Sequence, residues 1–412
     1  MRNFSPLWKW RPVSELSALA GAASVFLSIR EAKVFLDSPM WCSSISELRL
    51  RGVGIPCDNV FSLFIEDEDL IFGCKKKLLQ ALEEADVNES DKLLCVAVNC
   101  GPALVGDDIT GICSAAANGV PVAVADAGGF TGEFDDGYAK AVLALLNTLN
   151  PQPCRKKKNA VNILGYSPVD RYAEGTLQEI KRMLAFCDLE VNITVGELEN
   201  SMESVARLGS AEYNIVLNEE RGLEPAEWLK EKLAQPFISV GLPFGIQGCR
   251  EWIGKIASAM EVSVSDQFEK ELEVLGKEIF QCRLQTFQSD FQIKRAVLSG
   301  TYEKIIPVAG AIQREWKQAE IFVNVSDREE ETEFIHWDAQ TELPGLPQNT
   351  LQILVGTEID RVLLGDIDRT IFVSIDDTQG SVRTARETLA GIRGWAIFME
   401  KVFAQYRNLC FY

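Results

Sequence analysis

Apolar and polar positions alternate in blocks along the N-terminal part of the chain. Short apolar runs rich in β-branched residues, typical of strands buried on both faces, lie at residues 32–36, 93–98 and 120–124. Longer segments with apolar residues at helical spacing lie at residues 17–29, 75–85, 109–118 and 136–149. A regular alternation of strands and helices predicts a parallel sheet with helices on its faces.

The same alternation returns twice further along the chain. Two prolines and four consecutive basic residues within positions 150–158 mark a solvated boundary. Beyond it, strands are expected to begin at residues 161, 190, 213 and 237, with helices at 175–185, 202–208, 225–234 and 249–259. A helical connector at 266–291 precedes expected strands at 293–299, 320–325, 353–355 and 370–373 and closing helices over 381–403. We therefore expect an α/β fold of three doubly wound parallel-sheet subdomains, at residues 1–150, 159–262 and 263–412.

The stretch at residues 100–109 places a cysteine where an apolar run ends. Gly101 and Pro102 are expected to break the strand, and Asp107 and Asp108 are suited to cap a helix that starts behind them. Cys100 is therefore expected at the carboxyl end of a strand, where open α/β sheets bind their ligands. The alternative for a single cysteine there is a small buried hydrophobic residue.

Two further positions favour the ligand-binding interpretation of Cys100. Cys42 also follows an apolar run and a turn, 58 residues earlier (100 − 42), and Ser17 precedes Cys42 by 25 residues (42 − 17). The chain contains no CxxC pair, which argues against a local rubredoxin, zinc-ribbon or ferredoxin site. A metal cluster would have to be assembled from distant cysteines.

These segments resemble the nitrogenase component 1 family. The resemblance is carried by residues 17–22, the Pro-x-x-Cys turn at Cys42, residues 71–78 and residues 100–109. The family includes the two subunits of the molybdenum-iron protein, cofactor-assembly scaffolds, and protochlorophyllide, chlorophyllide and nickel-sirohydrochlorin reductases. Its members typically carry three cysteines at these places, which ligate an iron–sulfur cluster shared between two subunits. The spacing here is most similar to the β-type subunit of the molybdenum-iron protein.

The resemblance implies that Cys42 and Cys100 are cluster ligands, but it is broken at Ser17, where the family usually has its first cluster cysteine. A serine oxygen is a harder donor than a thiolate and binds iron less readily. Three alternatives stay open. The cluster is held by two thiolates and those of the partner, Cys57 or Cys74 replaces the missing ligand, or the cluster is degenerate. Its nuclearity, whether P-cluster-like or [4Fe–4S], also stays open.

The resemblance makes further residues informative. Where the cofactor-bearing α-subunit of nitrogenase supplies a cofactor cysteine, this chain has Asn218, and residues 373–378 lack the histidine that the α-subunit supplies near its C-terminus. The only histidine, His336, is interpreted as structural. Residues 127–132 form a glycine-rich loop, and a similar Gly-Phe-x-Gly loop approaches the cluster region in the family.

Three arginines near the C-terminus allow two interpretations. Arg383, Arg386 and Arg393 either form a solvated or salt-bridged face or line a cleft and hold the carboxylates of an anionic substrate. Gly391 to Gly394 resembles a Gly-Tyr-x-Gly segment that is often found there in the family.

Composition narrows the function class. A net charge of −19 over 412 residues argues against a nucleic-acid partner, because little would neutralise phosphates. Eleven cysteines without disulfide-like spacing fit a reducing cytoplasm. The apolar run after Leu16 is diluted by small residues and is too short for a membrane span, so we expect a buried helix and neither a signal peptide nor a membrane anchor.

Hydrolytic chemistry finds no support in the sequence. One histidine allows no Ser-His-Asp triad to be argued, and neither a G-x-S-x-G elbow nor a G-x-x-x-x-G-K-[ST] loop is present. ATP would therefore act only through a partner, which the resemblance supplies as a homodimeric, ATP-dependent iron–sulfur reductase.

The leading hypothesis is a β-like, cofactor-lacking subunit of a nitrogenase-like oxidoreductase that works without oxygen. It would pair with a homologous α-like subunit in a heterotetramer, hold an iron–sulfur cluster at their interface, and relay electrons to a substrate or cofactor site lying mainly in the partner. The alternatives are a tetrapyrrole reductase subunit, a metal-cluster assembly scaffold without turnover, and a small-molecule binding module in which every cysteine is structural.

Overall fold

The structure is a computed structural model that describes residues 17–87, 92–116, 119–130, 132–286, 292–325, 332–337, 343–364, 367–376 and 387–411. Its described strands form three sheets, and every strand pair in them is parallel. The chain divides into two compact units. We call residues 15–169 and 189–239 the N-terminal unit, and residues 170–188 and 240–412 the C-terminal unit.

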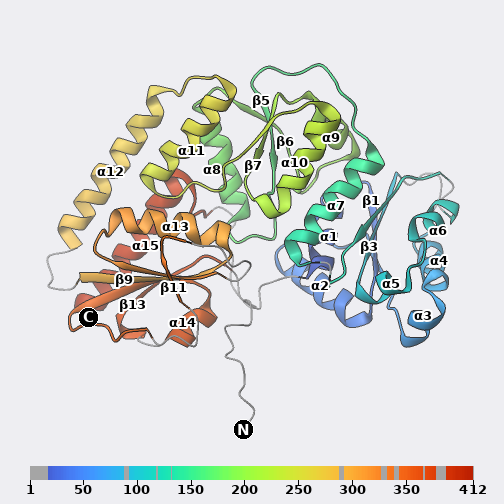
Figure 1. Ribbon diagram of the computed structural model, residues 1–412, viewed down its shortest axis with the longest axis horizontal. Coiled ribbons are helices and arrows are strands. Elements are labelled where there is room, and N and C mark those ends of the chain that lie inside the picture. Colours follow the sequence, from blue (N-terminus) through green and yellow to red (C-terminus); the bar gives the residue numbers. More distant parts are fainter. Residues whose placement is uncertain are drawn as a thin grey trace, which may run out of the picture. The chain divides into compact units, whose positions relative to one another are not determined.

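The first sheet lies in the N-terminal unit and has the strand order β2-β1-β3-β4 (Figure 1). Its strands are β1 (Ala32–Asp37), β2 (Val60–Ser62), β3 (Leu93–Val98) and β4 (Val122–Asp126). Its helices are α1 (Ala18–Phe26), α2 (Met40–Gly52), α3 (Asp67–Phe72), α4 (Lys75–Glu84), α5 (Cys100–Val105), α6 (Ile109–Ala116) and α7 (Phe134–Leu149). β3 is buried along its whole length, which explains why its sequence is continuously apolar.

Successive residues of β1 enter two different cores, as the pleat of a strand requires. Val34 and Leu36 pack in a core with residues of α1 and α7, whereas Phe35 packs in a core with residues of α4 and α6. Each face of the sheet is therefore covered by its own pair of helices.

The second sheet also belongs to the N-terminal unit, with the order β6-β5-β7-β8. Its strands are β5 (Ala160–Leu164), β6 (Glu190–Thr194), β7 (Tyr213–Val216) and β8 (Phe237–Ser239), accompanied by α9 (Met202–Ala206), the 3₁₀ helix η2 (Arg207–Ser210) and α10 (Glu219–Leu233). The core that contains α1 and α7 continues into residues of this sheet and of α10. The first two sheets thus share one hydrophobic core.

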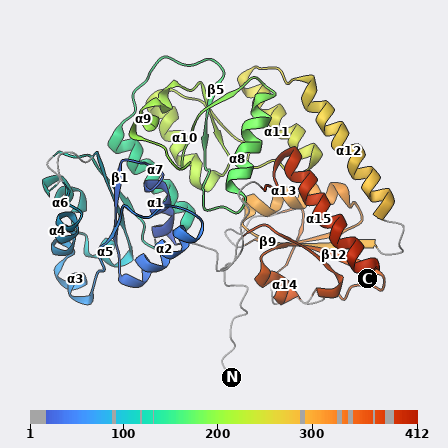
Figure 2. The ribbon, with the colours of Figure 1, turned by 180° about the vertical axis from the view of Figure 1, so that it is seen from behind.

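The third sheet lies in the C-terminal unit, with the order β11-β10-β9-β12-β13. Its strands are β9 (Gln292–Gly300), β10 (Glu320–Val325), β11 (Ile335–His336), β12 (Thr350–Gly356) and β13 (Thr370–Ser374). The helices of this unit are α8 (Ala173–Ala185), α11 (Gly245–Met260), α12 (Asp266–Thr286), α13 (Tyr302–Glu315), α14 (Glu358–Leu364), η3 (Ile367–Arg369) and α15 (Gly391–Phe411). Helix α12 packs beside α15 (Figure 2).

The structure confirms the α/β class with parallel sheets, and each predicted subdomain contains one of the three sheets. The subdomain boundaries at 1–150, 159–262 and 263–412 stay a prediction. Strand β3 ends at Val98, as predicted, but Gly101 and Pro102 lie inside a helix and do not end the strand, and the predicted helix start at Pro225 is wrong. Helix α5 already begins at Cys100, with Pro102 in its first turn, and α10 begins at Glu219 because the Asn218 side chain caps it.

Several short elements were missed, because their sequences are too short for periodicity to be read. They are β2, β11, α3, α5 and α14. The longer helices α2 and α13 were not predicted either, and α2 takes the place of the turn that was expected at Cys42. The expected start of the closing helices, at residue 381, lies outside the described residues. Within the part of the chain that the structure describes, none of the helices combines the length and the apolar character needed to cross a membrane.

Candidate functional site

Cys100 begins α5, directly after the carboxyl end of β3. Asn99 links strand to helix, because its side-chain oxygen accepts the Cys100 N–H at 2.7 Å while its own N–H donates to the Asp37 carbonyl at 3.0 Å. The Gly129 N–H donates to Cys100 Sγ at 2.9 Å. The glycine-rich loop at 127–132 therefore reaches this cysteine. An N–H donor on sulfur is the kind of contact that stabilises and tunes a metal-bound thiolate.

Gly128 and Gly129 bring the backbone of the loop close to Cys100. A Cβ atom on Gly129 would lie 3.5 Å from Cys100 Sγ, and one on Gly128 would lie 3.4 Å from the Cys100 Cα. Both distances are ordinary van der Waals contacts, so the loop backbone passes directly beside Cys100.

Cys42 is the third residue of α2 and is exposed. Its helix follows β1, and β1 pairs with β3 in a register that sets Asp37 opposite Val98. Since the two strands are parallel neighbours, Cys42 and Cys100 both follow the same edge of the first sheet. The turn before Cys42 is held by Ser38 and Ser43, whose buried hydroxyl oxygens are 2.5 Å apart.

Ser17 lies at the N-terminus of α1 and is exposed. Its hydroxyl oxygen accepts the Ala20 N–H at 3.5 Å, so it caps the helix. Its backbone forms an isolated antiparallel bridge with Glu133, the residue that caps α7. The Gly129 loop ends beside this bridge, which brings Ser17 to the loop that contacts Cys100.

Cys57 and Cys74, the two possible replacement ligands, are buried. Burial raises the pKa of the Cys57 thiol, which donates to the Ile55 carbonyl at 3.5 Å. Burial, with the nearby Asp37 carboxyl group, raises the pKa of the Cys74 thiol to about 12. Both thiols are protonated near neutral pH where they lie, so each would have to lose its proton to bind iron.

The residues present fit one half of a shared iron–sulfur site. Cys42 and Cys100 supply accessible sulfur at one sheet edge, and the Gly129 N–H is already directed at one of them. Among the described residues, no group of three or more Cys, His, Asp or Glu side chains is arranged to hold a metal ion. A cluster bound here would need ligands in addition to these two sulfurs.

Exposed apolar side chains surround this edge, and we call them the apolar rim. Its members are Met40, Trp41, Ile45 and Leu48 on α2, Leu70, Ile71 and Phe72 on α3, Leu104 on α5 and Phe130 in the loop after β4. Figures 1 and 2 show α2, α3 and α5 at the same end of the first sheet. Large exposed apolar surfaces on soluble proteins mark interaction sites.

Asp37, at the end of β1, is a site residue that the sequence analysis did not single out. Its side chain is fully buried, and neither carboxylate oxygen has a hydrogen-bond partner among the described residues. Burial, followed by the charges of Asp107 and Asp69, raises its pKa from 3.8 to about 7. The sequence signal was a carboxylate that ends a largely apolar strand two residues before the Pro-x-x-Cys segment.

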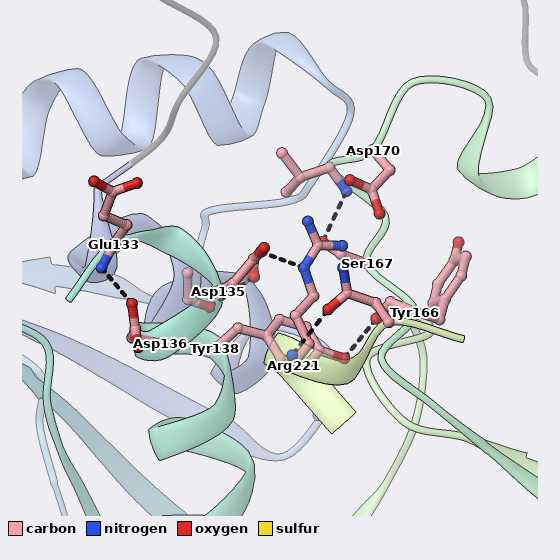
Figure 3. Close-up of polar contacts among 12 residues, drawn as sticks. Glu133, Asp135, Asp136, Tyr138, Tyr166, Ser167, Asp170 and Arg221 are labelled. Carbon is pink, nitrogen blue, oxygen red and sulfur yellow. Dashed lines mark hydrogen bonds and ion pairs between the residues drawn. The ribbon is translucent and has the colours of Figure 1, made fainter. Parts of the chain in front are cut away.

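Asn218 has a structural role where the family's α-subunit carries a cofactor cysteine. Its side-chain oxygen accepts the Arg221 N–H at 2.9 Å, which caps α10. The Arg221 guanidinium forms a buried ion pair with Asp135 on α7 (Figure 3). It also lies over the Phe134 ring, 5.2 Å from its centroid. Arg221 therefore joins α10 to α7 through its contacts with Asp135 and Phe134.

Two other expectations concern the C-terminal unit. His336 is exposed on the edge strand β11, so it does not belong to the core. Arg393 lies near the start of α15, with its guanidinium 3.9 Å from the buried Glu179 carboxylate, which also accepts the Arg393 N–H at 3.0 Å. Of the two interpretations of Arg393, these contacts support the salt-bridged face. Arg383 and Arg386 lie outside the described residues.

Comparison with known proteins identifies the family of this chain. The family model described as nitrogenase component 1 type oxidoreductase matches residues 17–330. The chain belongs to the nitrogenase component 1 type oxidoreductase family. The solved structure of nitrogenase Cp1 at pH 6.5 superposes with a TM-score of 0.76 at 14% identity, covering 99% of this chain and 94% of that one. The family resemblance and the fold expected from the sequence are confirmed.

Curated relatives of this nitrogenase component 1 type chain match it over shorter lengths. The nitrogenase iron-molybdenum cofactor biosynthesis protein NifE of Clostridium pasteurianum is 26% identical over 265 residues, covering 61% of this chain and 56% of NifE. A subunit of the light-independent protochlorophyllide reductase of Cereibacter sphaeroides is 26% identical over 178 residues, covering 43% of this chain and 34% of that protein. The matches thus span 56% or less of these relatives' own lengths.

Proposed function

We propose that this chain is the β-like subunit of a nitrogenase-like reductase, with Cys42 and Cys100 as its ligands to an iron–sulfur cluster shared with an α-like partner. The observation that supports this most is the Gly129 N–H on Cys100 Sγ at a sheet edge that also carries Cys42 and the apolar rim. Thiolates at a protein surface surrounded by exposed apolar residues suit a site completed by a second chain.

When bound, the cluster would supply one-electron transfer. The chain's own residues would hold the two sulfurs, donate the Gly129 N–H to one of them, and exclude water through the apolar rim once the partner is docked. Ser17 remains a weaker ligand candidate, because its oxygen already caps α1.

The electron donor in this proposal is a homodimeric, ATP-dependent iron–sulfur reductase, and the assembly is a heterotetramer with the α-like subunit. The chain itself has no Walker-type phosphate loop, so ATP would be bound by the reductase. The electrons would pass to a substrate or cofactor site lying mainly in the α-like partner, since Asn218 offers no thiolate in this chain.

The test is anaerobic co-purification with the α-like partner, followed by iron and sulfide analysis and visible absorption. Cys42→Ala and Cys100→Ala should each strip most of the cluster absorbance. Cys154→Ala and Cys410→Ala are matched controls that remove thiols far along the chain from this edge, and they should leave it intact. Equal behaviour of all four variants, or an iron-free wild type, would contradict the proposal.

Two relatives support second candidates. The similarity to NifE favours a scaffold that binds a metal-cluster precursor and releases it without turnover. The similarity to the protochlorophyllide reductase chain favours a component of a tetrapyrrole reductase. Turnover with the reductase and ATP separates an enzyme from a scaffold, and a bound or reduced tetrapyrrole identifies the second candidate.

A further inference from the structure

Asp37 presents a buried carboxyl group that the structure leaves without a partner. Its exposed fraction is 0%, and neither side-chain oxygen accepts or donates a hydrogen bond within the described residues. A buried polar group in this state requires a physical explanation, because leaving it unpaired destabilises the fold, and more so if it is charged.

None of the described groups that affect the pKa of Asp37 is a cation that could balance its negative charge. It lies on the same face of β1 as Phe35, toward α4 and α6, and the groups coupled to it are Cys74, Cys113, Asp69 and Asp107. Burial raises the pKa of both thiols to about 12, so they are uncharged near neutral pH. The remaining neighbours are carboxylates. Lys77 is directed elsewhere, to Glu66 at 3.1 Å and Asp69 at 3.9 Å.

This environment favours a bound proton on Asp37. Burial and the like charges of Asp107 and Asp69 raise its pKa to about 7, so the group changes charge close to neutral pH. Asp107 is itself held in place, because its carboxylate accepts the Cys74 N–H at 2.5 Å. The like charge next to Asp37 is therefore a fixed feature of the fold.

Asp37 is also joined to the cysteine edge. Its carbonyl oxygen accepts the Asn99 N–H at 3.0 Å, and the Asn99 side chain accepts the Cys100 N–H at 2.7 Å. Paired strands lie about 4.8 Å apart and Cys100 is two residues beyond Val98, so the Cα atoms of Asp37 and Cys100 are within roughly 12 Å. Two charges at that separation inside a protein interact appreciably.

We propose that Asp37 takes up one proton when one electron arrives at the cysteine edge and releases it when the electron leaves. The inference rests on the proposed function, which supplies the reductase as electron donor. On electron arrival, the Asp37 carboxylate forms one O–H bond with a proton drawn from water, and the net charge of the region stays unchanged. On electron departure to the acceptor in the partner, that O–H bond breaks and the proton returns to water.

The experiment measures the midpoint potential of the anaerobically loaded complex between about pH 6 and about pH 9. With wild type, the potential should fall as pH rises, by up to about 59 mV for each tenfold fall in proton concentration, the one-electron constant. In Asp37→Asn this dependence should disappear. In Asp107→Asn it should move to lower pH, because one of the charges that raise the Asp37 pKa is removed.

The matched control is Asp58→Asn, which removes one negative charge from a side chain that is 87% exposed in the same unit. It should keep the wild-type pH dependence. Reduction-minus-oxidation infrared spectra give a second readout, in which a protonated carboxyl band should appear in wild type and be absent from Asp37→Asn. Circular dichroism shows whether each variant is folded. If Asp37→Asn does not fold, the shift of the pH dependence in Asp107→Asn still tests the proposal.

The two proposals fail in different ways. A complex that loads iron and sulfide but whose potential depends on pH equally in wild type and Asp37→Asn overturns the proton coupling and leaves the proposed function standing. A complex that binds no iron through Cys42 and Cys100 overturns the proposed function, and the proton coupling falls with it.

Discussion

Near the candidate site, an acidic residue changes its charge close to neutral pH. Asp37 is buried beside two further carboxylates, and its pKa is raised from 3.8 to about 7. A carboxyl group with a raised pKa stabilises the fold while it is protonated. Its contribution is complete below about pH 4, falls as pH rises, and is lost above about pH 7.

We therefore expect Asp37→Asn to stabilise the cluster-free chain at pH 8 relative to wild type. The change of pKa corresponds to about 4 kcal/mol as an upper limit. At pH 4 the two proteins should differ little. Urea unfolding followed by tryptophan fluorescence at both pH values measures the difference, and Asp58→Asn should show no such pH-dependent gain. An Asp37→Asn variant that gains nothing at pH 8 would show that the carboxyl group is hydrated or paired.

Helices α1 and α7 pack unusually closely, and two glycines make this possible. A Cβ atom on Gly21 would lie 2.0 Å from the Phe134 carbonyl oxygen, and one on Gly137 would lie 2.0 Å from the Ala18 carbonyl oxygen. Neither backbone can move without displacing its helix. The pair therefore sets the distance between the two helices that cover one face of the first sheet.

Gly21→Ala or Gly137→Ala should destabilise the chain by about 2 kcal/mol or more, because the added methyl group overlaps backbone atoms. Gly254→Ala is the matched control, since Gly254 also lies inside a helix, α11, but has no atom within 4 Å of its Cβ position. That substitution should stabilise by roughly 0.5 to 1 kcal/mol. Thermal unfolding of the three variants measures the difference, and similar melting temperatures would refute the close packing.

On the scale of the whole molecule, the apolar rim is the candidate surface for binding a partner protein. Trp41 is 72% exposed and Phe72 is 85% exposed, although both are large hydrophobic side chains. Leu70 packs beside Gly101, where a Cβ atom would lie 2.7 Å from Leu70 Cδ2, so α3 and α5 contact each other. The rim is thus built on connected elements next to Cys100.

We expect the double variant Trp41→Ser/Phe72→Ser to weaken association with the α-like partner at least tenfold, since burial of such side chains contributes about 1.5–3 kcal/mol each. Its melting temperature as an isolated chain should hardly change, because both side chains are exposed. Phe280→Ser, at a side chain that is 60% exposed on α12, is the control and should leave association unchanged. Sedimentation of mixtures with the partner measures the effect. Unaltered association of the double variant would exclude the rim as the interface.

The amino-acid order alone was enough to establish the class of fold and most of the longer elements, although α2 and α13 were not predicted. Buried strands such as β3 and amphipathic helices such as α4 have periodicities that depend only on which faces are covered. The family was recognisable because the order and spacing of its motifs survive even where Ser17 replaces a cysteine. The sequence also shows directly that it contains no G-x-x-x-x-G-K-[ST] phosphate loop.

The surroundings of each candidate residue became known only from the folded chain. The fold placed the Gly129 N–H on Cys100, buried Cys57 and Cys74, and enclosed Asp37 among other acids. These outcomes depend on contacts between residues far apart in the chain. The local periodicity of apolar residues does not predict such contacts. Burial and charge at a site are sums over neighbours, and those neighbours are assembled only when the chain folds.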